Sequence, residues 1–330
     1  MTATPQLVAT ILSSPSRLFM PIITFPGARL AHTNVREMVT DPVKQCAASE
    51  ALQAQFQTPF VLSAMDLSVE AEAFGATIRM DDWEIPSVVG RYLTEGNGIA
   101  SLAIPKIGTK RTGVYLATVR RLRARVAGAL VLGGMIGPFS LAGRLYGVSE
   151  ALAETMGEPE LMHTLLEKTT AFLIAYARAF KEAGAHGVLM AEPTAGLMSP
   201  ASFRQFCTPY VRQIVSAVND NDFQVILHNC GARITHLAPS LETGARIFHF
   251  GKPMDIVAAL EQVPDDVVLC GNLDPSEVFV NGTVAEVRMK TEKLLEATAQ
   301  YKNFVISSGC DVPAQAPMQN LWTFFAAETG

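Results

Sequence analysis

The stretch from residue 224 to residue 231 reads QVILHNCG, a short apolar run that ends in a histidine, a cysteine and a glycine. A run of this length, bounded by a turn residue, is typical of a strand that is covered on both faces. Similar runs recur along the chain, and each predicts a strand. They are Leu18–Thr24, Pro59–Met65, Ala129–Met135, Gly187–Met190, Gln224–His228, Ala245–Phe250, Asp266–Gly271 and Asn303–Ser308.

Longer amphipathic stretches separate the later runs and predict helices. They are Pro159–Ala183, Pro200–Val218, Met254–Gln262 and Val284–Ala299. Alternation of buried strands with helices builds a parallel sheet, and eight such units close into a (β/α)₈ barrel, or TIM barrel. We therefore expect an α/β fold with one domain over residues 1–330. The long mixed stretch Asp66–Gly113 predicts an elaborated loop region after the second strand.

Composition excludes several classes of function. With 26 Lys+Arg against 31 Asp+Glu, the net charge is −5, so the chain lacks the basic surface of a nucleic-acid binder. The longest uncharged run, Val126–Gly143, contains several glycines and Pro138, which favours a buried strand and loop over a membrane span. The first positive charge is Arg17, so we expect no secretion signal and a cytoplasmic protein.

The cysteines are scattered and odd in number, which favours free thiols in a reducing compartment. They are Cys46, Cys207, Cys230, Cys270 and Cys310. Two of them follow predicted strands. Residues two apart in a strand face the same side, so His228 and Cys230 should project together from the end of their strand.

A third ligand should come from another strand, because a catalytic zinc has about three protein ligands and one open position. Cys310 follows the last predicted strand, and the ends of these two strands face one another across a small barrel. Thiolate and imidazole together suit Zn²⁺. The sequence therefore predicts a zinc site made of His228, Cys230 and Cys310.

Other polar residues also end predicted strands. Glu192 could accept the proton released when a thiol binds the zinc, or occupy the vacant coordination position, so we expect it to be catalytic. Asn272 is expected to bind substrate through hydrogen bonds. His249 could also reach the substrate at the mouth, although the lack of an evident partner favours a structural role. For Cys46, Cys207 and Cys270 we expect packing roles.

Motifs of other enzyme classes are missing. The chain has no Gly-x-x-x-x-Gly-Lys-Ser/Thr loop, no Gly-x-Gly-x-x-Gly after a strand and no Gly-x-Ser-x-Gly turn, which argues against phosphoryl transfer and nicotinamide chemistry.

Other segments do match a family. They are Gly137-Pro138-Phe139-Ser140-Leu141, Ala191-Glu192-Pro193, Leu197-Met198-Ser199-Pro200, Phe203-Arg204-Gln205-Phe206, Leu227-His228-Asn229-Cys230-Gly231, Gly271-Asn272 and Gly309-Cys310.

These segments resemble the uroporphyrinogen decarboxylase superfamily, and within it the methylcobamide:coenzyme M methyltransferases. The resemblance implies a TIM barrel whose zinc is held by His228, Cys230 and Cys310. It implies methyl transfer between a corrinoid, carried as methylcobalamin on a partner corrinoid protein, and a small thiol such as coenzyme M. A homodimer is one option for the assembly.

Three alternatives stay open at this stage. The first is transfer in the opposite direction, from a methyl donor to the corrinoid protein, as in an O-demethylase component. The second is decarboxylation of a tetrapyrrole, which needs several cationic groups at the mouth, whereas only Arg29 lies near the end of the first predicted strand. The third is a metal-binding or corrinoid-binding module without turnover.

Overall fold

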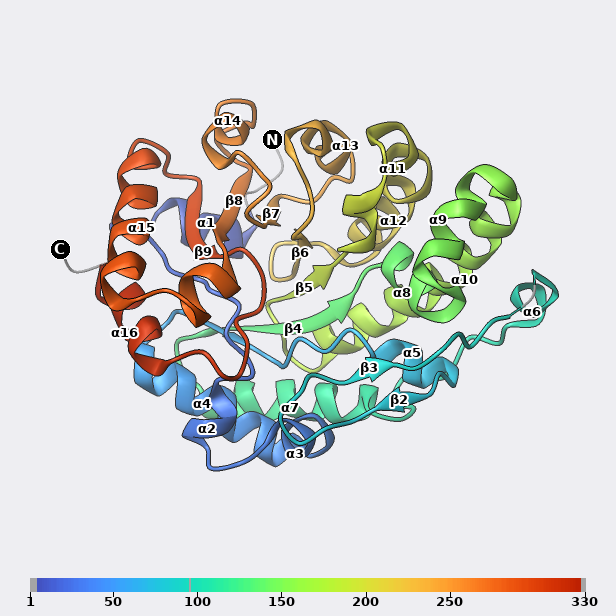
Figure 1. The fold of residues 1–330 in the computed structure, drawn as a ribbon, viewed down its shortest axis with the longest axis horizontal. Coiled ribbons are helices and arrows are strands. Elements are labelled where there is room, and N and C mark those ends of the chain that lie inside the picture. Colours follow the sequence, from blue (N-terminus) through green and yellow to red (C-terminus); the bar gives the residue numbers. More distant parts are fainter. Residues whose placement is uncertain (1–4, 95, 328–330) are drawn as a thin grey trace.

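A parallel sheet forms the centre of the computed structural model, which describes residues 5–94 and 96–327 (Figure 1). Its seven strands are hydrogen-bonded in the order β1-β4-β5-β6-β7-β8-β9. They are β1 (Phe60–Leu62), β4 (Leu130–Ile136), β5 (Gly187–Ala191), β6 (Gln224–Asn229), β7 (Ile247–Phe250), β8 (Val268–Leu273) and β9 (Phe304–Ser308). All neighbours are parallel, so their carboxyl ends meet at one mouth. This confirms the predicted TIM-barrel fold.

The first predicted strand, Leu18–Thr24, is the exception. It forms a single bridge, from Phe19 to Ile306 of β9, and no ladder with β1. Pro21 has no N–H to donate, and the Ile23 N–H turns back to the Pro21 carbonyl at 3.0 Å. The segment therefore occupies the eighth position of the barrel as an extended chain, and the prediction of a full strand was wrong.

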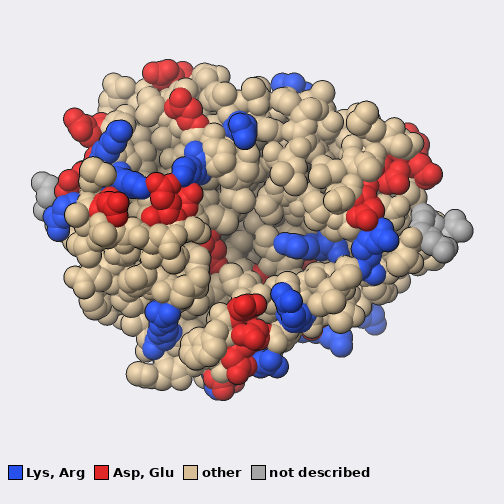
Figure 2. Space-filling model, viewed as in Figure 1, with Lys and Arg blue, Asp and Glu red and all other residues tan. Residues whose placement is uncertain are grey.

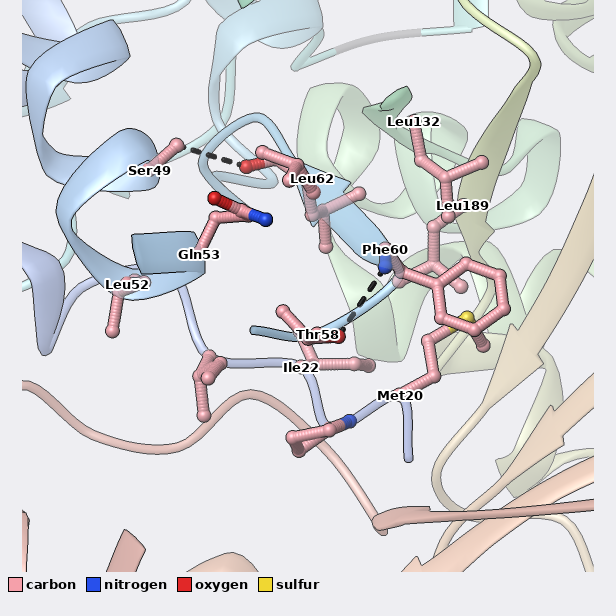
Figure 3. A pocket seen from close by; sticks show the side chains of 13 residues that line it. Met20, Ile22, Ser49, Leu52, Gln53, Thr58, Phe60, Leu62, Leu132 and Leu189 are labelled. Atoms are coloured by element: carbon pink, nitrogen blue, oxygen red, sulfur yellow. Dashed lines mark hydrogen bonds between the residues drawn. The ribbon is translucent and has the colours of Figure 1, made fainter. Parts of the chain in front are cut away.

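Side chains fill the gap between this segment and β1. Figure 3 shows Met20, Ile22 and Phe60 beside Leu132 and Leu189, around a cavity of about 30 Å³. Ser49 closes one side by donating to the Leu62 carbonyl at 3.0 Å. Packing therefore closes the barrel here, where main-chain hydrogen bonds do not.

Helices surround the sheet (Figure 1). The longer ones are α4 (Pro42–Phe56), α7 (Thr112–Arg125), α10 (Pro159–Glu182), α12 (Thr208–Val218) and α15 (Val284–Ala297). The shorter ones are α1 (Gln6–Leu12), α2 (Gly27–Leu30), α3 (Val35–Thr40), α8 (Pro138–Tyr146), α9 (Val148–Gly157), α11 (Pro200–Phe206), α13 (Leu237–Leu241), α14 (Ile256–Leu260) and α16 (Met318–Ala326). Leu7, Val8 and Ile11 of α1 pack with the apolar side chains inside the barrel.

One predicted helix is divided in two. The sequence favours a single helix over Pro200–Val218, but α11 ends at Phe206 and α12 begins at Thr208. Pro209 lacks the N–H that a continuous helix needs, and it fits the first turn of a new one. Cys207 consequently lies at the junction, fully buried, where it packs as expected.

The stretch Asp66–Gly113 is the predicted elaboration after β1. It contains α5 (Val69–Phe74), the antiparallel pair β2 (Ile78–Arg79) and β3 (Ser87–Val88), and α6 (Gly96–Ser101). The run Val126–Gly143 forms β4 and the start of α8. Within the described residues, no helix is both long and apolar enough to cross a membrane.

Arg111 ties the two ends of this elaboration together. Its guanidinium is ion-paired with Asp66 and with Glu72, the latter at 2.6 Å, and it donates to Ser68 Oγ at 2.8 Å. Glu70 lies beside this cluster, 1% exposed, with Oε1 accepting from the Ile136 N–H at 3.0 Å and Oε2 unpartnered. Burial raises the pKa of Glu70 to about 8.

Glu70 should make the protein less stable as pH rises. Its pKa in the unfolded chain is the ordinary value of 4.5, so between pH 4.5 and about 8 only the folded state keeps the proton. The free energy of unfolding therefore falls with pH across this window. Glu70→Gln keeps an acceptor for the Ile136 N–H and carries no titrating proton. The free energy of unfolding of this variant should therefore fall less steeply with pH.

Urea unfolding of the wild type and Glu70→Gln at pH 5 and pH 8 tests this. We expect the variant to gain stability relative to the wild type at pH 8. An identical pH dependence in both proteins would show that Glu70 is ionised in the folded state. Glu84→Gln, on the exposed part of the elaboration, is the control and should leave the pH dependence unchanged.

Candidate metal centre

Strand β6 carries two of the predicted ligands to the mouth of the barrel. Its residues are all buried, and His228 lies in register with Ala191 of β5 and His249 of β7. Cys230 follows immediately, where Gly231 donates its N–H to Asn229 Oδ1 at 3.1 Å and turns the chain. A Cβ at Gly251 would overlap the main chain of Cys230, so glycine allows the loop after β7 to lie against this ligand.

Cys310 arrives from the opposite side of the mouth, two residues after β9. The ligand atoms of His228, Cys230 and Cys310 all lie within 4.8 Å of one another. Two sulfurs and one imidazole nitrogen form a donor set that suits Zn²⁺. The residues at this site therefore fit the metal that the sequence predicts.

The two thiols share one hydrogen bond. Cys310 donates to the Cys230 sulfur, which lowers the pKa of Cys230 to about 7 and raises that of Cys310 to about 12. One thiol of the pair therefore loses its proton easily. A thiolate, rather than a thiol, is the form that binds a metal.

His249 and Ser307 fix the ring of His228 from behind. The Ser307 hydroxyl donates to the Met20 carbonyl at 2.6 Å and so can only accept from His249 Nε2, which lies 2.7 Å away. His249 Nδ1 is then the acceptor that faces His228 Nδ1 at 2.9 Å. Burial and the nearby His228 hold the pKa of His249 well below its ordinary value, so its ring is neutral.

This chain of hydrogen bonds fixes the tautomer of His228. It places a proton on Nδ1, which leaves Nε2 as the ring nitrogen that would bind a metal. His249 is fully buried and does not line the cavity at the mouth. Its two ring nitrogens are hydrogen-bonded to His228 and Ser307. The substrate-binding role predicted for His249 has no contact to support it, whereas the structural role does.

A cavity of about 310 Å³ opens in front of the three ligands. Ile22, Met65 and Leu67 give it apolar walls, and Ile85 to Val88 of the elaboration cover one side. Figure 2 shows the corresponding hollow near the centre of this face, with blue side chains on the side where α8 lies in Figure 1. Such an apolar cavity with a few convergent polar groups is typical of a site for a small molecule.

Two polar residues of this cavity were not singled out from the sequence. Asp311 accepts from Thr24 Oγ1 at 2.9 Å, and its burial raises the pKa of the carboxyl well above the ordinary value. Arg144 reaches the cavity from the last turn of α8. The position of Asp311 directly after Cys310 was a usable signal. The sequence around Arg144 contains no such signal, because arginines are common near the carboxyl ends of helices.

The carboxylate of Glu192 lies at the amino end of α8. It accepts from the Phe139 N–H at 3.0 Å, and from the N–H and hydroxyl of Ser140 at 2.6 and 2.5 Å. It is fully buried, which raises its pKa to about 7. A Cβ at Gly137 would overlap it. Glu192 therefore joins β5 to α8, and its N–H donates to the His228 carbonyl at 2.8 Å. None of the hydrogen bonds of its carboxylate in the described part of the chain goes to His228, Cys230 or Cys310, so its catalytic role stays a prediction.

Asn272 does not line this cavity. Its Nδ2 donates to the carbonyls of Gly251 and Met254 at 3.2 and 2.7 Å. These bonds hold the loop after β7, which packs against Cys230. Asn272 lines a separate groove with Lys252 and Glu277, so the substrate-binding role predicted for it is not supported by its contacts.

Comparisons with known proteins agree with this geometry. The uroporphyrinogen decarboxylase (URO-D) family model matches residues 11–329. The chain is 30% identical over 289 residues to the methylcobamide:CoM methyltransferase MtbA of Methanosarcina mazei, covering 86% of this chain and 84% of the relative. It is also 29% identical over 252 residues to the uroporphyrinogen decarboxylase of Desulfotalea psychrophila, covering 74% and 72%.

A solved structure has the same fold. A methyltransferase from Methanosarcina mazei superposes with a TM-score of 0.89 at 24% identity, covering 100% of this chain and 98% of that one. The fold is thus shared over the whole length, including the elaboration between β1 and β4. The chain belongs to the uroporphyrinogen decarboxylase family, and it is an enzyme related to the methylcobamide methyltransferases within that family.

Proposed function

We propose that the protein transfers a methyl group between a corrinoid and a small thiol, with Zn²⁺ bound by His228, Cys230 and Cys310. The observation that carries the proposal is the convergence of these three ligand atoms within 4.8 Å at the wall of an open cavity. The names of the relatives, which include methylcobamide:CoM methyltransferases, support the same chemistry.

The metal would supply one property. Zinc held by two thiolates and a neutral imidazole has a formal charge near zero, so it lowers the pKa of a bound thiol from about 8.5 while the sulfur stays nucleophilic. The residues of this chain provide the rest. His249 and Ser307 hold the ring of His228 in its orientation, and the apolar walls around Met65 and Leu67 exclude water from the sulfur.

In the reaction that we propose, the thiolate sulfur attacks the methyl carbon of methylcob(III)alamin in line. The sulfur–carbon bond forms, the cobalt–carbon bond breaks, and both electrons of that bond stay on the cobalt as cob(I)alamin. The corrinoid would be presented by a partner protein at the open side of the mouth. The same geometry serves the reverse direction, with a methylated substrate as donor.

Tetrapyrrole decarboxylation fits this cavity less well. A substrate with several carboxylates needs several cations, and Arg144 is the one Lys or Arg that lines the cavity among the residues described. Arg29 is exposed and does not line it. A cytoplasmic location also belongs to the proposal, because the five cysteines are all free. Assembly as a homodimer stays a prediction.

The purified protein should contain about one zinc per chain. Cys230→Ala and Cys310→Ala should each lose most of it, because either change removes one of three ligands, while circular dichroism shows that the barrel is still folded. Cys270→Ala is the matched control, since Cys270 is buried inside the barrel. Metal analysis giving full zinc occupancy in both ligand variants would refute the assignment.

The zinc-loaded protein should also interconvert methylcob(III)alamin and cob(I)alamin, seen as a change in corrinoid absorbance when a thiol or a methyl donor is added. A chelator should abolish the change, and added zinc should restore it. Decarboxylation of uroporphyrinogen by the metal-free protein at a normal enzymatic rate would show that the reaction class is wrong.

A further inference from the structure

Cys230 and Cys310 are the two cysteines of this chain that a small molecule can reach. Both are partly exposed and both line the cavity of about 310 Å³, whereas the other three thiols are buried. Cys46 lies on α4, Cys207 at the junction of α11 and α12, and Cys270 on β8 inside the barrel. A dissolved oxidant that enters the cavity therefore meets these two sulfurs first.

The loops that carry the two cysteines pack against the same glycine. A Cβ added at Gly251 would lie 2.8 Å from the Cys230 Cα, and a Cβ added at Gly309 would lie 3.1 Å from the Gly251 Cα. Gly309 directly precedes Cys310, so this packing holds the main chains of both cysteines close together. A disulfide bridges Cα atoms up to about 7 Å apart, and the arrangement favours one for that reason.

The two sulfurs already face each other. They lie within 4.8 Å of one another, and Cys310 donates its thiol hydrogen bond to the Cys230 sulfur. Each cysteine comes just after a strand, β6 or β9, and belongs to a loop. A bond between the sulfurs therefore requires rotation of side chains at the mouth and leaves the paired strands in place.

We propose that Cys230 and Cys310 are also a modification site, at which hydrogen peroxide converts the two thiols into a disulfide. One sulfur attacks a peroxide oxygen, so that the O–O bond breaks and a sulfenic acid forms. The second sulfur displaces that oxygen, so that the S–S bond forms and the S–O bond breaks. The sulfurs give up two electrons, and the peroxide leaves as two water molecules that carry both thiol protons.

The disulfide and the zinc exclude each other. Its formation removes two of three ligands, and His228 alone does not hold zinc. In the zinc form both sulfurs are thiolates, so the solvent supplies the two protons of the water that leaves. This loss of metal rests on the proposed function, whereas the disulfide of the metal-free chain does not. Peroxide would then inactivate the enzyme reversibly, since a dithiol can reduce the disulfide and the ligands can bind zinc again.

Mass spectrometry of the metal-free full chain tests the modification site. After treatment with about one equivalent of hydrogen peroxide, the chain should lose two hydrogen atoms and yield one cross-linked peptide pair that contains Cys230 and Cys310. Cys270→Ala is the matched control and should give the same pair. Oxidation in urea should instead distribute the cross-links over several cysteine pairs, because the fold no longer selects one.

A variant with a single sulfur separates the two steps. Cys310→Ser, shown to be folded by circular dichroism, should stop at a sulfenic acid on Cys230, which dimedone traps. Two results in the folded wild type would overturn the inference. One is a sulfinic acid on either cysteine while the other thiol stays free, and the other is a disulfide that includes Cys46, Cys207 or Cys270.

The zinc-loaded protein tests the loss of metal, followed with a chromophoric chelator. Peroxide should release about one zinc for each disulfide formed, and dithiothreitol with added zinc should restore the bound metal. Zinc that stays bound to a chain carrying the disulfide would contradict the proposed ligands and leave the modification site standing. Zinc release without the disulfide would overturn the modification site and leave the proposed function standing.

Discussion

The mouth of this barrel depends on one chain of hydrogen bonds, from His228 through His249 and Ser307 to the Met20 carbonyl. It links β6, β7 and β9 to the extended segment that completes the barrel. Because the serine hydroxyl has a single proton and gives it to a carbonyl, every other proton in the chain has a fixed position. A change at Ser307 would therefore alter the orientation of His228, the candidate metal ligand, without contacting it.

The fold supplies this arrangement through parallel register. His228 lies beside His249 on the neighbouring strand, while Asn272 of β8 pairs with Ser307 of β9. Residues at the ends of different strands thus meet at one end of the barrel, although His228 and Cys310 are 82 positions apart in the sequence. At the opposite end, where the strands begin, apolar side chains of α1 pack into the barrel.

Much of the architecture could be predicted because apolar runs and amphipathic stretches alternate so regularly. The convergence of His228, Cys230 and Cys310 was also predictable, since each lies at or just after the end of such a run. The failures have physical causes. Pro21 interrupts the first strand. The role predicted for Asn272 stays a prediction, because its amide donates to the carbonyls of a loop. Glu192 ends a strand as expected, but only the structure reveals that a helix amino end binds its carboxylate.

X-ray absorption at the zinc edge tests the central claim most directly. The zinc-loaded protein should show two sulfur neighbours at about 2.3 Å and a nitrogen neighbour at about 2.0 Å, and addition of a thiol should add a third sulfur. A first shell with fewer than two sulfurs would contradict the assigned ligands. A shell that stays the same when a thiol is added would contradict the claim that the site activates one.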